Sequence, residues 1–150
     1  MDQPVKPADF ARVVRIMHGA MVAGLALVGA TFFLLLRVRQ SPALGSTPSL
    51  GVALAGLGVG LLAVTVTVLR RRVPERPLDQ SPDAYWATVE RRGAAIVLWA
   101  VVEGAGLLAS IGYVLTGAVA PAVVAVLAIA LLIVFRPSGL EGEVSNREHR

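Results

Sequence analysis

The sequence predicts an all-α integral membrane protein: a four-helix bundle made of two hairpins, each entering the membrane from the cytoplasm. Of the 150 residues, 55% are hydrophobic and 16% are charged, whereas an ordinary soluble domain has about 25% charged residues. Charged side chains are absent from residues 16–36 and 40–69, and from 93–135 apart from Glu103. Because a membrane-crossing helix needs about 20 apolar residues, these stretches provide four spans. Buried helices of a soluble protein would need a polar face, which they lack.

The limits of the spans follow from breaks in the apolar pattern. The first apolar stretch is longer than the 7–15 residues of a signal-peptide core, so we expect it to be a retained span. The third stretch is divided at Thr116-Gly117, and Pro121 lies in the first turn of the next helix, where its missing N–H costs little. The predicted order is cytoplasmic flank 1–13, span 14–36, external loop 37–49, span 50–69, cytoplasmic loop 70–92, span 93–116, span 118–135 and cytoplasmic tail 136–150, with one membrane domain over residues 7–136.

The central loop combines an Arg/Pro-rich part with a helix start. Ser81 suits the N-cap position, Pro82 the first helical position, and Asp83 the positive end of the helix dipole. We expect one continuous helix from about residue 82 to Thr116, with its first turns outside the hydrocarbon. Asp9 opens the first helix of the chain in a similar way.

The orientation follows from the distribution of Lys and Arg in the short flanks. Twelve of the 14 Lys and Arg residues lie in the N-terminal flank, the central loop and the C-terminal tail, and the other two follow the first span. Cytoplasmic loops carry the excess of positive charge. The protein is therefore expected to be multi-pass, with both termini in the cytoplasm, and its pI near 10.6 reflects topology and attraction to anionic lipids.

The two halves of the chain show weak internal similarity. A shift of 80 residues superimposes Ile16 on Ile96 and Gly24 on Gly104. Since each half has two spans, a duplication would give a parallel repeat, which differs from the inverted repeats of many transporters.

Glu103 and His18 are the candidate residues for an intramembrane site. Glu103 falls near the bilayer centre, where a charged side chain is costly and functional roles are common. It could bind a proton or a cation, alone or paired with His18, or it could be a protonated residue that hydrogen-bonds a neighbouring helix. We expect no cofactor and no metal, and haem ligation by His18 would need a second histidine from another copy.

Small residues in the spans predict close helix packing. Gly56 and Gly60 form a GxxxG step, and similar spacings occur in the first and third spans. Packing within the bundle is the main expectation, and a homodimer interface is the alternative. The residues assigned to helix packing are Gly19, Ala23, Gly24, Gly56, Gly60, Gly104, Gly106 and Ser110.

The central loop supplies residues for contact with lipid headgroups. Its arginines set the topology and attract anionic lipids, and an aromatic pair is expected at the membrane interface. These residues are Arg70, Arg71, Arg72, Arg76, Arg91, Arg92, Tyr85 and Trp86. A sensor or lipid-binding role of these arginines is a further alternative.

Several function classes are excluded by what the sequence lacks. It contains no cysteine, no HExxH or Walker A motif, and no recognisable Ser/His/Asp set. We therefore expect no enzymatic activity, no catalytic residues and no nucleic-acid partner.

Two segments resemble a known type of protein. HGAMVAG at residues 18–24 and WAVVEG at 99–104 are similar to the HxA[LM]xxG and [WL]AxxEG patterns of small, uncharacterised four-span bacterial membrane proteins, whose last span ends near Arg-Pro, as at Arg136-Pro137. The resemblance covers about residues 12–137 and implies a bacterial membrane but no activity. A weaker similarity links the chain to the proteolipid c subunits of rotary ATPases, although Glu103 lies on the first helix of its hairpin and theirs lies on the second.

The expected function is that of a non-enzymatic structural or accessory subunit in the bacterial inner membrane. Its expected partners are the lipid bilayer and either other membrane-protein subunits or a second copy of the chain. The alternative is a proton- or cation-translocating protein that uses Glu103 with His18.

Overall fold

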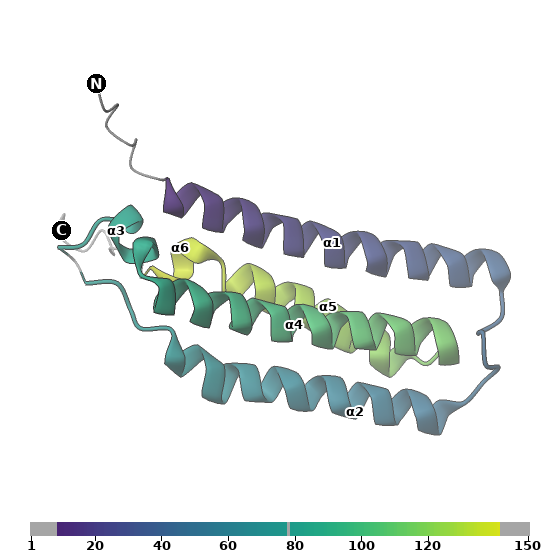
Figure 1. The fold of residues 1–150 in the computed structure, drawn as a ribbon. Helices are drawn as coiled ribbons and strands as arrows, with labels where there is room; N and C mark the ends of the chain where they lie inside the picture. Colours follow the sequence, from purple (N-terminus) through teal and green to yellow (C-terminus); the bar gives the residue numbers. More distant parts are fainter. Residues whose placement is uncertain (1–8, 78, 142–150) are drawn as a thin grey trace, which may run out of the picture.

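The computed structural model describes residues 9–77 and 79–141, and all regular elements in this part of the chain are helices. The four long helices form one bundle (Figure 1). Their bounds, with those of the short elements, are α1 Phe10–Arg39, α2 Pro48–Val64, the π turn η1 Thr65–Leu69, the 3₁₀ turn η2 Arg70–Arg72, α3 Pro82–Ala87, α4 Val89–Thr116, α5 Val119–Val134 and α6 Pro137–Leu140.

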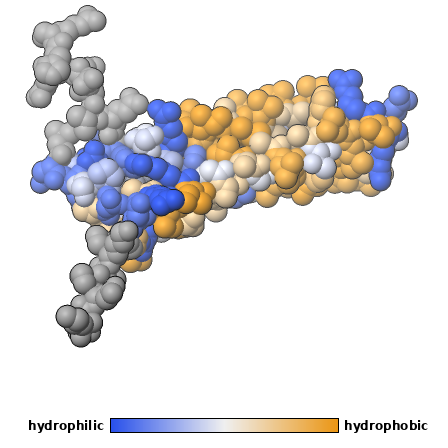
Figure 2. Space-filling model, turned by 90° about the horizontal axis from the view of Figure 1, so that it is seen from above, coloured by the Kyte–Doolittle hydropathy of each residue, from blue (hydrophilic) through white to orange (hydrophobic). Residues whose placement is uncertain are grey.

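Three helices are long and apolar enough to cross a membrane. They are α1, the continuous helical segment Pro48–Arg72 and α4. The fourth expected span is shorter, because α5 has 16 residues and so extends about 24 Å at 1.5 Å per residue, against about 30 Å of hydrocarbon. Figure 2 shows a broad apolar belt between two hydrophilic ends.

The helix α4 is the centre of the bundle. It packs against α1, α2 and α5, and it lies between α1 and α2 (Figure 1). The two predicted hairpins therefore differ: α4 and α5 pack against each other, whereas α1 and α2 do not pack along each other. The loop between α1 and α2 crosses the end of α4, where the N–H groups of Ala43 and Leu44 donate to the carbonyls of Val114 and Leu115 at 3.2 and 3.0 Å. Terminal carbonyls of a helix lack partners within it, so this loop supplies the hydrogen bonds that two carbonyls at the end of α4 would otherwise lack. The same crossing places α1 and α2 on different sides of α4.

The predicted helix ends are confirmed where they depend on local groups. The Asp9 side chain accepts from the N–H of Arg12 and caps α1, and Ser81 Oγ accepts from the N–H of Ala84 and caps α3. Gly117 ends α4 in the left-handed conformation, with φ of 67°, which costs a glycine little.

The expected continuous helix from residue 82 to Thr116 is interrupted at Thr88. This residue has φ of −71° and ψ of 117°, which separates α3 from α4. The break lets α3 fold over the end of the bundle, where Tyr85 and Trp86 are fully buried. Their prediction as interfacial lipid anchors is therefore wrong, since both rings pack inside the protein.

The helices α1 and α4 run parallel, in a register close to the 80-residue shift of the sequence comparison. The ring of Phe33 stacks on Tyr113 at 6.4 Å, and the Arg92 guanidinium lies over the ring of Phe10 at 4.7 Å. A Cβ added to Gly29 would lie 3.9 Å from Ser110 Oγ. The equivalent helices of the two halves thus lie side by side at matching heights, as a parallel duplication would place them.

Candidate functional site

His18 closes the end of α5. Its Nε2 lies 2.9 Å from the carbonyl oxygen of Leu132, and its ring meets Trp99 edge-on at 4.9 Å. Because a carbonyl can only accept, Nε2 carries the proton of this bond. Trp99 Nε1 donates to the carbonyl of Phe135 at 2.7 Å. The carbonyls at the end of α5 thus receive hydrogen bonds from side chains of α1 and α4. We call this group the α5 cap; it consists of His18, Trp99, Leu132 and Phe135.

A second layer of buried polar contacts covers the α5 cap. Trp86 packs on Trp99 at 6.3 Å, and its Nε1 donates to Glu141 Oε1 at 2.8 Å. The same Glu141 oxygen lies 3.5 Å from Arg15 Nη2. The Glu141 side chain is 8% exposed, so its charge is held by a guanidinium and an indole N–H rather than by water.

Two further hydrogen bonds hold α3 against α1 and against the central loop. Asp83 Oδ1 accepts from the N–H of Ala11 at 3.0 Å, and the Tyr85 hydroxyl donates to the carbonyl of Pro74 at 2.5 Å. Burial raises the pKa of Tyr85 above its ordinary value, while the nearby charges of Arg91 and Arg70 act in the opposite direction. Tyr85 therefore serves as a buried hydrogen-bond donor.

Glu103 lies near the middle of α4 and faces Gly24 of α1. A Cβ added to Gly24 would lie 3.9 Å from Glu103 Oε1. The side chain is half-buried, and it makes no hydrogen bond or ion pair with any residue in the described part of the chain. The possible pair with His18 is not formed, because the hydrogen bond of His18 goes to Leu132 and its ring packs edge-on against Trp99.

The residues assigned to helix packing divide into two groups. A Cβ added to Gly106 would lie 2.6 Å from Leu25 Cδ2, and Ser110 Oγ donates to the Gly106 carbonyl at 2.8 Å. With Gly24, these residues form the contact of α1 with α4, as predicted. For the other group the prediction of packing within the bundle is wrong, because Ala23 is exposed and a Cβ would meet nothing within 4 Å at the glycines. These outward-facing residues are Gly19, Ala23, Gly56, Gly60 and Gly104.

Two glycines that were not assigned to helix packing hold α2 in place. A Cβ on Gly51 would lie 2.6 Å from Ala118 Cβ, and one on Gly58 would lie 2.9 Å from Val124 Cγ1. Gly51, Ala55, Gly58 and Leu62 are all buried, and their spacing is that of one helix face. This periodicity was the available signal, and the GxxxG step next to it lies on the opposite face.

An apolar groove of about 290 Å³ opens between α1, α4 and α5. Its walls consist of small residues and phenylalanines on α1, Ser110 and Tyr113 on α4, and aliphatic residues on α5, and they carry almost no polar surface. Six of its lining residues are Ala26, Gly29, Phe33, Ser110, Tyr113 and Ile129. The groove can hold apolar chain or side chain, but it offers no group for acid–base chemistry.

The arginines of the central loop differ in their partners. Arg70 and Arg76 donate to the carbonyls of Val73 and Gln80, and Arg91 donates to Gln80 Oε1 at 2.7 Å. Arg92 lies over Phe10. Arg71 and Arg72 are exposed and make no hydrogen bond or ion pair with any described residue.

Comparisons with protein-family models, curated proteins and solved structures find no significant match for this chain. The resemblance to small four-span bacterial membrane proteins therefore stays a prediction. Within residues 9–77 and 79–141, no group of three or more His, Cys, Asp or Glu could hold a metal ion.

Proposed function

We propose that this chain is a small polytopic protein of the bacterial inner membrane, with both termini in the cytoplasm, and that it acts as a non-enzymatic accessory subunit of a membrane complex. Glu103 is the observation that carries the proposal. Its carboxyl group lies in the middle of the apolar helix α4 and has no partner among the described residues. Such a group costs a few kcal/mol or more at the bilayer centre unless it is protonated or paired. A hydrogen-bond donor on a second protein would supply the missing partner.

The surroundings of Glu103 suit contact with another helix. Gly104 follows it on the exposed side of α4, and a Cβ there would meet nothing within 4 Å. Glycines at an outer face let a second backbone approach closely. Gly56 and Gly60 offer a second face of this kind on α2. The imidazole of His18, which could otherwise bind a proton or a ligand, is already hydrogen-bonded to the Leu132 carbonyl in the α5 cap.

Purification in a mild detergent tests the proposal through the particle mass and the proteins that co-migrate. We expect a stoichiometric complex that Gly104→Leu dissociates, because the new side chain blocks the approach of a partner helix. Gly93→Leu is the matched control, since Gly93 is equally open and lies on the same helix nearer its start. A wild-type particle with the mass of the lone chain would overturn the accessory-subunit assignment.

Proton or cation translocation through Glu103 is the second candidate, favoured by the same unpartnered carboxyl group. Glu103→Gln separates the two functions, because an amide keeps a hydrogen bond but cannot exchange a proton. If assembly is the role, the complex survives this substitution. If translocation is the role, proton flux into liposomes is lost while expression and fold stay unchanged.

A further inference from the structure

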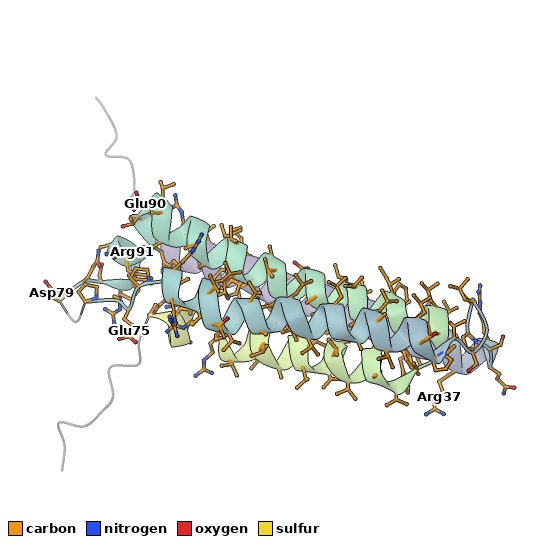
Figure 3. The ribbon with its side chains drawn as sticks, turned by 90° about the horizontal axis from the view of Figure 1, so that it is seen from below. Arg37, Glu75, Asp79, Glu90 and Arg91 are labelled. Carbon is orange, nitrogen blue, oxygen red and sulfur yellow. The ribbon has the colours of Figure 1, made fainter. Side chains whose placement is uncertain are left out.

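A small pocket lies between the end of the α2 segment and the start of α4. It measures about 300 Å³ and is lined by Arg72, Pro74, Thr88, Glu90 and Arg91. Figure 3 shows Glu90 and Arg91 at the start of α4, at the end of the bundle opposite Arg37. This is the end at which the sequence places the cytoplasmic headgroup region.

Two arginines line this pocket from different segments, Arg72 at the end of the α2 segment and Arg91 near the start of α4. Arg91 is fixed by its hydrogen bond to Gln80 and by the ring of Tyr85, which lies 4.8 Å from its Cζ. Arg72 is exposed and makes no hydrogen bond or ion pair with the described residues. One cation is therefore held in position and the other is free to close on a ligand, which suits a phosphate group.

The backbone adds to the positive character of the pocket. The first N–H groups of a helix have no partner within it, and no side chain caps α4, since Thr88 makes no capping hydrogen bond. The carboxylate of Glu90 lowers the net charge of the pocket. Two arginines and one carboxylate match a singly charged phosphodiester better than a doubly charged phosphate monoester.

The surface beside the pocket is apolar on its membrane side. Val68, one helical turn before Arg72, is 45% exposed, and Val97, further along α4 from Arg91, is 52% exposed. A ligand with a phosphate group and hydrocarbon chains could place its phosphate in the pocket and its chains along these valines. We propose that this pocket binds the phosphodiester of a membrane phospholipid headgroup through Arg72 and Arg91.

Native mass spectrometry of the detergent-purified protein, titrated with phosphatidylglycerol, tests this site. Arg72→Gln removes a charge-assisted hydrogen bond to the phosphate, so it should weaken the apparent affinity about tenfold. Arg71→Gln is the matched control, because Arg71 is equally exposed and equally free of partners but does not line the pocket. Glu90→Gln should strengthen binding, since it removes the like charge.

The source of the phosphate is distinguished by competition with millimolar inorganic phosphate and with glycerol 3-phosphate. Neither should displace the lipid, because they lack the hydrocarbon chains. Displacement of the lipid by either compound would show that the pocket binds a soluble phosphate, and it would overturn the proposal of a phospholipid site. Equal losses in Arg71→Gln and Arg72→Gln would show diffuse attraction without a site, and they would contradict the proposal. Circular dichroism checks that all variants remain helical.

Discussion

At the scale of single residues, His18 shows how a polar side chain in an apolar helix serves stability. Its partner is the carbonyl of Leu132, more than a hundred residues away in the chain. A backbone carbonyl leaves no mark in a sequence, so the α5 cap could not be predicted, and His18 was named only as a candidate partner of Glu103. Glu103 could be predicted as an unusual residue for the opposite reason, because one charge in a long apolar stretch is visible in the sequence itself.

Replacing His18 by phenylalanine isolates its hydrogen bond. The variant keeps an aromatic ring against Trp99 but leaves the buried carbonyl of Leu132 without a donor, which costs about 1–3 kcal/mol. Denaturant unfolding in detergent can be followed by tryptophan fluorescence, since both tryptophans of the chain lie in or beside the α5 cap. Met17→Leu is the control, because Met17 is 40% exposed. Equal unfolding midpoints for wild type and His18→Phe would contradict the capping role.

The buried hydroxyl of Tyr85 predicts a loss of stability in strong alkali. Burial raises the pKa of Tyr85 above its ordinary value of 10.0. The unfolded chain therefore loses this proton first, and the stability contribution is constant below pH 10 and falls as the pH rises through the folded-state pKa. Unfolding midpoints measured from neutral pH upwards should decline beyond pH 10 more steeply for wild type than for Tyr85→Phe. Parallel declines in the two proteins would count against this role.

At the scale of the helices, local signals proved reliable and tertiary ones did not. The caps at Asp9 and Ser81 and the turn at Gly117 depend on neighbouring residues, so the sequence predicts them. The break at Thr88 depends on distant contacts, since Tyr85 bonds Pro74 and Trp86 bonds Glu141. The GxxxG step at Gly56 was wrongly assigned to packing within the bundle for a related reason, because spacing alone does not say which glycines meet another helix.

Two neighbouring glycines of α4 provide a matched test of the helix packing. In Gly106→Ala the new methyl group would lie 2.6 Å from Leu25 Cδ2 and 2.9 Å from Ala128 Cβ, and overpacking of this kind costs about 1–3 kcal/mol. In Gly104→Ala the methyl group meets nothing within 4 Å, and the better helix propensity of alanine should leave stability equal or slightly higher. Thermal unfolding of the purified chain checks both, and the reverse order would contradict the α1–α4 contact.

At the scale of the whole molecule, the number of apolar helices could be predicted from the sequence, but their neighbours could not. Three apolar stretches, of which the third is long enough for two spans, indicate four helices, and consecutive helices joined by short loops usually pack together. Instead α4 separates α1 from α2, because the loop over residues 40–47 is bound to the end of α4. The hydrogen bond from the N–H of Ala43 to the carbonyl of Val114 joins two backbone groups, so it cannot be predicted from the hydropathy or the charge of the side chains.

The proposed orientation can be tested directly, because the chain contains no cysteine. Single cysteines at Ser46 and Asp79, both exposed, place one thiol in each of two opposite loops. A membrane-impermeant maleimide should label Ser46→Cys in intact spheroplasts and Asp79→Cys only in inverted vesicles. The opposite pattern would reverse the topology, and labelling of both in spheroplasts would place both loops outside.

The central position of α4 has a consequence for how the protein is made. A ribosome delivers α1 and α2 before α4, yet these two helices have little to pack against until α4 arrives. After insertion of its first half, the nascent chain therefore holds two separate helices, each with outward glycines and an unfilled packing face. The second half can form its own α4–α5 hairpin, and α1 and α2 can then pack against α4. Co-expressed halves of the chain, divided before Asp79, should consequently reassemble in the membrane.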